Sequence, residues 1–294
     1  MKKFTIRGKL FPTFGWLLMF TWSLIFLILL LWSTVTSFKS IFDFYLNPVG
    51  LPIKENGGWV FENYITAVKA INVTIKGVRY GMDTMLKNSL LFAVGNAFFS
   101  VLTACLASYI LAKYKYIRWV GGLWAIVLIT QYLPISSSLA SNIKYLHDLG
   151  LYDSMIGNWI WSSGTFAGIF LMYYAAWRSV SWTYAEAAFI DGAGHFRAMV
   201  QVMWPMTRTI FGVLFLTQFI GLWNDYMTPL YYLPSYPTMS YGAWLFQFNI
   251  ENPDVAVAPI QLAGLLSLAF PIFILFLIFR NKLMGSLTLG GIKG

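Results

Sequence analysis

Residues 184–205 read YAEAAFIDGAGHFRAMVQVMWP, a polar segment with glycines between two long apolar runs. The segment opens with Glu186–Ala188, turns at Asp191–Gly192 and closes at Pro205, nineteen residues after the glutamate. Alanines after an acidic residue favour a short helix with little bulk, against which another surface can press closely. The sequence predicts two short helices joined at the glycines, the second ended by Pro205 before the next apolar run. The candidate residues for such a contact with another surface are Glu186, Ala187, Ala188, Asp191, Gly192 and Pro205.

An apolar stripe is also expected along this segment. Phe189, Ala193, Phe196, Val200 and Met203 follow one another at steps of four, three, four and three. Such steps place side chains on one face of a helix. The plainer alternative is an ordinary connecting loop in which Asp-Gly is only a turn.

The composition indicates a membrane protein. Of 294 residues, 58% are apolar, 19% aromatic and 11% charged, whereas a soluble domain carries about a quarter charged residues. Long apolar runs with few charges are typical of membrane-spanning helices. The sequence predicts an all-α membrane protein with one transmembrane domain over 1–294 and the polar segment at about 182–206. The six predicted spans are 15–37, 86–112, 119–140, 155–177, 207–232 and 257–279.

Two local features fit this interpretation. The first run follows a basic stretch but is too long for a signal peptide and lacks a small-residue cleavage site after Trp32, so we expect a retained span. Cys105 is the only cysteine and lies inside the second predicted span, which excludes disulfides and thiol clusters within the chain. Its expected role is that of a small apolar residue.

The net charge of +9 reports topology rather than a nucleic-acid partner. With six spans and a cytoplasmic N-terminus, thirteen of the twenty Lys and Arg residues lie on the inner side. Six of the seven outer ones lie in the long segment 39–87, where charge bias carries less weight.

That outer segment is expected to contain an amphipathic helix. Tyr64, Val68, Ile71, Ile75 and Val78 follow at steps of four and three. The helix would lie on the outer leaflet or, equally, pack on the span bundle.

Inside the spans, Pro134 and Pro271 predict helix bends, at a wall of a transport path or as plain structural kinks. Small residues four apart, such as Ala93 with Ala97 and Ala104 with Ser108, favour close helix packing.

The segment 186–205 resembles the EAA loop, the cytoplasmic motif through which ABC-importer permeases are coupled to their ATPases. Trp204 stands where that family usually has leucine. Other matches resemble the carbohydrate-importer branch, with MalG-like subunits. In chain order they are Glu62–Tyr64, Lys87–Leu90, Ala107–Lys113, Tyr145–Ser154, Trp223–Tyr226 with Pro229, and Leu287–Gly294.

The resemblance implies a function and a set of partners. Such a subunit forms half of a sugar pathway with a MalF-like second permease, in the bacterial cytoplasmic membrane with both termini inside. Homodimeric or heterodimeric ATPase subunits bind the coupling loop and the tail, here Thr288, Gly290 and Lys293. A periplasmic or lipid-anchored solute-binding protein delivers the sugar. The sequence has no GxxxxGK[ST] phosphate loop, so ATP and Mg would be bound by those partners and the chain is not expected to be an enzyme or to hold a cofactor.

Candidate pathway residues cluster near the outer end of the fifth predicted span. Asp225 is the only acid placed inside a span, where an ionisable group is a functional candidate; structural hydrogen bonding is the alternative. His147 and His195 fall on opposite sides of the membrane and form no metal site. The pathway candidates are Trp223, Asn224, Asp225, Tyr226, Tyr132 and Ser137.

Two other classes of function remain open. One is an ABC permease for a non-sugar solute, such as glycerol phosphate, a polyol or a peptide. The other is an ion-coupled carrier, which predicts buried charged pairs across several spans. Only Asp225 meets that description in the sequence.

Overall fold

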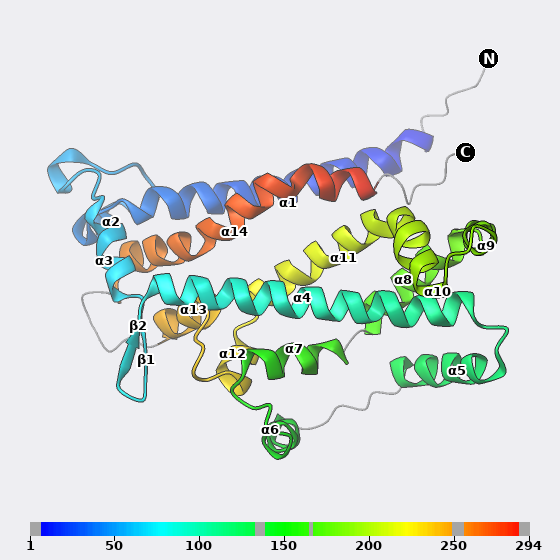
Figure 1. Cartoon of the computed structure of the whole chain (residues 1–294). Helices are drawn as coiled ribbons and strands as arrows, with labels where there is room; N and C mark the ends of the chain where they lie inside the picture. The colour runs from blue at the N-terminus through cyan, green and yellow to red at the C-terminus, as the bar shows by residue number, and fades with distance from the viewer. Residues whose placement is uncertain (1–6, 133–138, 165–166, 249–255, 288–294) are drawn as a thin grey trace. The chain divides into compact units, whose positions relative to one another are not determined.

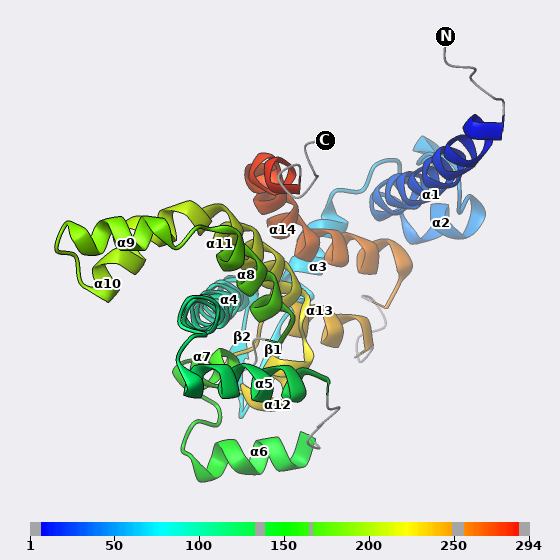
Figure 2. The ribbon, with the colours of Figure 1, turned by 90° about the vertical axis from the view of Figure 1, so that its right-hand side faces the viewer.

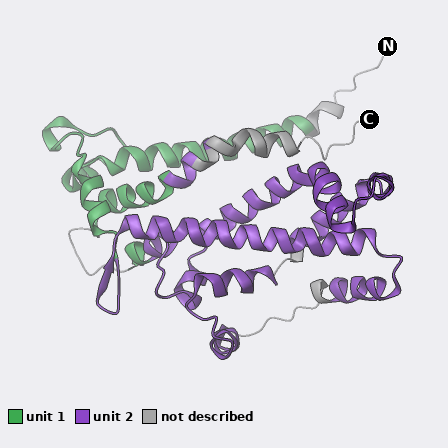
Figure 3. Cartoon of the chain, viewed as in Figure 1, with its two compact units in different colours: residues 1–72, 245–270 green, residues 73–244, 271–294 purple. Residues whose placement is uncertain are grey.

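The computed structural model describes residues 7–132, 139–164, 167–248 and 256–287 (Figure 1). Side chains are described for 12–129, 139–164, 168–248, 256–274 and 277. The chain divides into two compact units (Figure 3), residues 1–72 with 245–270 and residues 73–244 with 271–294. Each unit is described by itself below.

Unit 1 begins with α1 (Arg7–Ser37), whose apolar side chains from Phe14 to Leu31 are exposed. Short helices follow in the connection after it: α2 (Ile41–Leu46), the 3₁₀ turn η1 (Lys54–Asn56) and α3 (Glu62–Ala70). Ala67 of α3 packs against Ile260 and Ala263, at the start of α14 (Ala258–Leu287). This contact joins α3 to the last long helix of the chain.

The prediction of one helix that extends to Val78 is wrong for the second half of that segment. Helix α3 ends at Ala70, and β1 (Val73–Ile75) pairs antiparallel with β2 (Val78–Tyr80). The connecting residues Lys76 and Gly77 have φ of 50° and 81°, which is the backbone that a tight two-residue hairpin requires. The steps of three and four are therefore misleading, because β-branched residues flanking Lys-Gly favour short strands. The chain is mostly helical, with this one short hairpin among its described residues.

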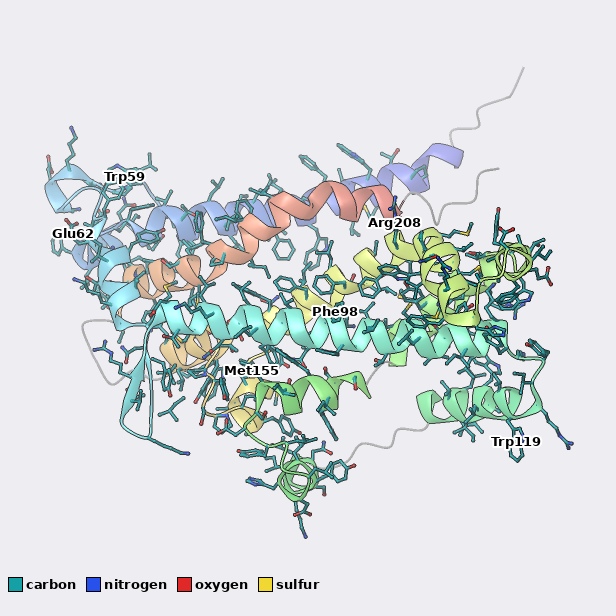
Figure 4. All side chains as sticks on the ribbon, viewed as in Figure 1. Trp59, Glu62, Phe98, Trp119, Met155 and Arg208 are labelled. Atoms are coloured by element: carbon teal, nitrogen blue, oxygen red, sulfur yellow. The ribbon has the colours of Figure 1, made fainter. Side chains whose placement is uncertain are left out.

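Unit 2 is built around α4 (Met82–Lys113), which contacts α7 (Met155–Ser163), α8 (Ala167–Ser179) and α11 (Trp204–Asn224). Figure 4 shows Phe98 midway along this helix. Ala93, Ala97, Ala104 and Ser108 are fully buried on α4. Small residues four apart thus lie where the neighbouring helices approach, as the sequence predicted.

The other helices of unit 2 are shorter. They are α5 (Arg118–Tyr132), α6 (Leu139–Asp148), α9 (Thr183–Ile190), α10 (His195–Arg197), the π-helix η2 (Ala198–Met203), α12 (Met227–Tyr232) and α13 (Met239–Phe248), whose last residues belong to unit 1.

Three helices in the described part of the chain are long and apolar enough to cross a membrane. They are Pro12–Ser37, Met82–Lys113 and His195–Asn224, and Arg118–Ile129 and Ala258–Ile274 are shorter apolar helices. The predicted fourth span is divided between α7 and α8. The count of six spans stays a prediction.

The predicted third and fifth spans differ from the observed helices. Helix α6 extends to Asp148, into a region expected to be a loop. Helix α11 ends at Asn224 instead of continuing to 232, because Asp225 is extended, with ψ of 111°. Its carboxylate accepts a hydrogen bond from the Thr228 backbone N–H at 3.0 Å. Asp225 therefore lies between two helices rather than inside one.

Candidate functional site

Residues 183–203, here called the elbow, form a helix, a turn and a second helical piece that leads into α11. Figure 2 shows α9 and α10 together beyond one end of α11. Gly192 N–H donates to the Phe189 carbonyl at 3.0 Å, and Ala193 N–H to the Ala188 carbonyl at 2.9 Å. This pair of bonds is a Schellman motif with Gly192 at φ +82°. Asp-Gly ends α9 because only glycine adopts this backbone without strain.

One face of the elbow is fixed in the core of unit 2. Ala185 and Met203 are fully buried in one cluster with Tyr173 and Trp177 of α8 and with side chains of α4. Ala198 is also fully buried. Alanine at these positions allows the short helices to approach the spans closely.

A cluster of aromatic side chains connects the elbow to the end of α4. The Tyr114 hydroxyl and His195 Nδ1 are 2.8 Å apart and form a hydrogen bond. The rings of Trp182 and Phe189 pack edge-on against Tyr114 and His195, respectively. Burial raises the pKa of Tyr114, so its hydroxyl stays protonated. The Lys113 ammonium adds a bond to the Val180 carbonyl.

The opposite face of the elbow is exposed and carries large apolar side chains. Ile190 is 86% exposed and Phe196 75% exposed, on either side of the turn. Glu186, Ala187 and Asp191 are exposed as well. Isolated exposed apolar residues are ordinary on a protein surface, and here two of them lie on either side of one turn.

The single apolar stripe predicted along the elbow is wrong. Met203 is fully buried whereas Phe196 is largely exposed. The prediction assumed one helical face through the glycines. The turn at Gly192 instead interrupts the helix, so the two helical pieces do not share one face.

Pro205 does not end a helix, contrary to the sequence prediction. His195–Asn224 is one continuous helical run, with Pro205 in the first turn of α11. Just before it, Trp204 N–H donates to the Met199 carbonyl, five residues back, as in a π-helix. Proline lacks an N–H and clashes with the carbonyl four residues earlier, and a wider turn accommodates both effects.

The candidate pathway residues in the 223–226 stretch make contacts within unit 2. Trp223 is buried against Ala93, Ala97 and Phe219. The Asn224 amide donates to the Ile220 carbonyl at 2.9 Å, and Tyr226 stacks on Trp244 with ring centroids 5.7 Å apart.

Several candidates cannot be placed. Ser137, Thr288, Gly290 and Lys293 lie outside the described residues, and so does the side chain of Tyr132. Their predicted roles in the pathway and in the tail contact stay predictions.

Hydrogen bonds that the sequence reasoning missed hold the chain after α12 in place. Asn88 donates to the Pro237 carbonyl at 3.0 Å, and the Met239 N–H donates to the Ser89 hydroxyl at 2.7 Å. Asp153, with φ of 52°, accepts bonds from Ser235 N–H and hydroxyl. In the sequence the Asn-Ser pair stands out only as part of a short match, and its polar character at the start of a span was the available signal.

Comparison with known proteins adds relationships in sequence and fold. No family model matches the chain. It is 27% identical to the diacetylchitobiose uptake system permease protein NgcG of Streptomyces coelicolor, over 93% of the chain and 86% of that protein. It is 28% identical to the sn-glycerol-3-phosphate transport system permease protein UgpE of Agrobacterium fabrum, over 59% of the chain and 60% of that protein.

A solved structure shares the fold. It is a bacterial ABC transporter involved in the import of the acidic polysaccharide alginate, with a TM-score of 0.76 and 17% identity. The match covers 96% of this chain and 99% of that one. The chain is thus similar over nearly its whole length to a permease protein of an uptake system, and it shares its fold with a bacterial ABC transporter.

Proposed function

We propose that the chain forms half of the membrane pathway of an ATP-driven, binding-protein-dependent importer of oligosaccharides. The relative matched over most of both lengths is named for the uptake of diacetylchitobiose, a short saccharide. The fold neighbour imports a polysaccharide. Both support a saccharide as the solute.

The elbow is proposed as the site that receives motion from an ATPase subunit. The single observation that carries this role is its two-sided construction. Ala185 and Met203 are buried in the same core as Trp177, while Ile190 and Phe196 project outward. Burial of each exposed side chain in a partner groove would stabilise docking by about 2 kcal/mol. Since the buried face is fixed to α4 and α8, a displacement of the tip moves these helices.

The proposed assembly contains three further kinds of subunit. A MalF-like permease completes the pathway, a pair of ATPase subunits binds ATP and Mg, and a solute-binding protein presents the sugar. The tail, through Thr288, Gly290 and Lys293, adds a second contact with the ATPases. The complex would lie in the bacterial cytoplasmic membrane with both termini of this chain in the cytoplasm.

The proposed sugar contacts lie near the 223–226 stretch. Tyr226 and Trp244 stack with an interplanar angle of 8°, which makes a flat aromatic pair. Such faces suit the apolar side of a pyranose ring, and the Asp225 carboxylate lies next in the chain to Tyr226. Asp225 itself caps α12, so its proposed contribution is to orient this pair.

Glycerol phosphate is the second candidate solute, because UgpE matches over 59% of the chain. A phosphate monoester carries about two negative charges near neutral pH and requires basic side chains in the pathway. A saccharide requires aromatic faces and neutral hydrogen-bonding groups instead. The two solutes therefore predict different effects of substitutions at Tyr226 and Trp244.

ATPase stimulation tests the proposal. The purified complex, reconstituted with its binding protein, is exposed to neutral oligosaccharides, acidic oligosaccharides and sn-glycerol 3-phosphate. We expect an oligosaccharide to stimulate the ATPase and sn-glycerol 3-phosphate not to do so. Tyr226→Ala should reduce transport more than Tyr226→Phe. Stimulation by glycerol phosphate and by no saccharide contradicts the proposed solute. Solute accumulation by the chain without ATPase subunits contradicts the importer mechanism and indicates an ion-coupled carrier.

A further inference from the structure

The segment 38–53, here called the outer loop, has its polarity reversed relative to a soluble loop. Lys39 and Asp43 are both fully buried, although charged side chains of soluble proteins are almost never fully buried without a partner. The exposed side chains of this loop are apolar. They are Ile41, Phe42, Tyr45, Leu46, Pro48, Val49, Leu51 and Ile53.

The buried charged groups have hydrogen-bond partners inside the loop or just after it. The Lys39 ammonium donates to the Asn47 carbonyl. The Asp43 carboxylate accepts from the Asn56 side-chain amide at 3.1 Å and from the Ile53 N–H at 3.4 Å. From Ile41 to Leu51 the only charged residue is Asp43. The outer surface of this stretch therefore carries no charge.

One hydrogen bond fixes the position of the outer loop along α1. Trp32 Nε1 donates to the Pro48 carbonyl at 2.9 Å. Trp32 lies five residues before Ser37, the end of α1 and of the candidate span, a distance of about 7 Å along the helix. After leaving α1 the chain thus turns back and runs beside its last turns, at a level still inside the apolar helix.

We infer that the outer loop is embedded in the lipid leaflet at the C-terminal end of α1 and anchors the permease at that interface. With the N-terminus in the cytoplasm, as proposed above, this is the outer leaflet. Lipid requires that polar groups be satisfied within the protein and that the contacting surface be apolar, and the outer loop meets both conditions. Amphipathic helices that lie in a membrane interface bury their apolar face about 5–10 Å into the boundary between headgroups and acyl chains. The level of Trp32 falls within that depth.

Lipid fits this surface better than a second permease does. The exposed apolar surface of the outer loop continues that of α1, whose side chains from Phe14 to Leu31 are exposed around the helix. One protein partner contacts one side of a helix, whereas lipid surrounds it. Exposed charges return only at Lys54 and Glu55, beyond the loop, at the point where an interface with water is expected.

Site-directed labelling tests the inference. In the full chain with Cys105→Ala, single cysteines replace Val49 and Val78, two exposed valines of the outer loop and of strand β2, 79% and 55% exposed. In intact cells, a membrane-impermeant maleimide should react with Val49→Cys about tenfold more slowly than with Val78→Cys. Leu29→Cys on α1 is the lipid-facing reference.

A lipid-quenching measurement separates lipid from protein as the cover. The purified protein, labelled with bimane at the same positions, is reconstituted in vesicles of phosphatidylethanolamine and phosphatidylglycerol containing shallow doxyl-labelled lipid. Quenching at Val49→Cys and not at Val78→Cys is expected. Equal maleimide rates at the two valines overturn the inference. Slow labelling at Val49→Cys without quenching also overturns it, since it assigns the surface to another subunit.

Discussion

At the scale of single residues, the turn of the elbow depends on the backbone conformation of one glycine. Gly192 adopts φ +82°, and a Cβ atom at this position would meet no other atom within 4 Å, so a substitution meets strain but no clash. Gly194 is also in open space but has φ −75°, which any residue adopts. The two glycines of the same turn therefore separate the effect of conformation from that of bulk.

Replacement of Gly192 by valine is expected to uncouple transport from ATP hydrolysis while the spans stay folded. A β-branched residue in the left-handed region costs roughly 1–2 kcal/mol, which shifts the turn rather than unfolding the core. Sugar transported per ATP hydrolysed, in reconstituted vesicles, should fall several-fold. Gly194→Val serves as the matched control and should remain near the unsubstituted ratio. Equal ratios for both variants would show that the turn conformation is not required for coupling.

Glu186→Lys is expected to weaken docking of the ATPase without loss of folded permease. Glu186 is exposed in the first turn of α9, where reversal of its charge opposes the helix dipole by about 0.3–1 kcal/mol. That penalty is too small to unfold α9, which Ala185 fixes in the core. Co-purification of the ATPase measures the effect, with Glu186→Gln as the milder control. Normal co-purification and coupling would exclude Glu186 from the interface.

At the scale of elements, the sequence predicted helices well and their interruptions poorly. The elbow was predicted as two helices joined at glycines, and the structure has α9 before Gly192 and α10 after it. The hairpin at 73–80 was missed because five apolar residues at helical steps also fit two short strands. Periodicity in a short segment does not separate these cases, and the Lys-Gly turn was the decisive signal.

The ends of helices were also hard to predict. The sequence stays apolar past Asn224, so its hydropathy does not reveal the helix break at Asp225. The capping bond from the Thr228 N–H to the Asp225 carboxylate creates this break. Pro205 was expected to end a helix, whereas the preceding π-helix lets the helix continue. For the site, residue types predicted short helical pieces around a turn, but which face is buried depends on packing against α4 and α8, contacts that no local pattern contains.

Pro205→Ala is expected to convert η2 into a regular α-helix. With the N–H restored, the bond to the carbonyl four residues back becomes available and the wider turn is no longer favoured. The change rotates α10 relative to α11, so transport per ATP should fall although thermal stability is unchanged or higher. Stability and coupling are measured on the same preparation. A variant with normal coupling would show that the π-helix has no part in aligning the elbow.

At the scale of the whole molecule, the chain supplies long apolar helices and an exposed elbow, and the proposal assigns the ATP chemistry to other subunits. Among the described residues, no group of His, Cys, Asp or Glu is arranged to hold a metal ion. The fold is shared with a bacterial ABC transporter over 96% of the chain.

Truncation after Thr288 is expected to lower ATPase activity of the complex more than it lowers membrane insertion. The removed residues, 289–294, follow α14, whose helix ends at Leu287, so the spans keep all their residues. Insertion is measured by alkaline extraction of membranes and ATPase turnover on the purified complex. Unchanged turnover in the truncated complex would contradict a tail contact with the ATPases.

The exposure of the α1 side chains has a consequence for how the sequence of this helix evolves. Every described side chain from Pro12 to Leu31 is exposed, so packing among the described residues constrains the shapes of these side chains little. Selection at these positions acts on hydrophobicity rather than on the identity of each residue. Leucine, isoleucine, phenylalanine and valine should therefore replace one another almost freely. In a saturation library selected for growth on the transported sugar, this helix should tolerate apolar swaps that the alanines of α4 reject.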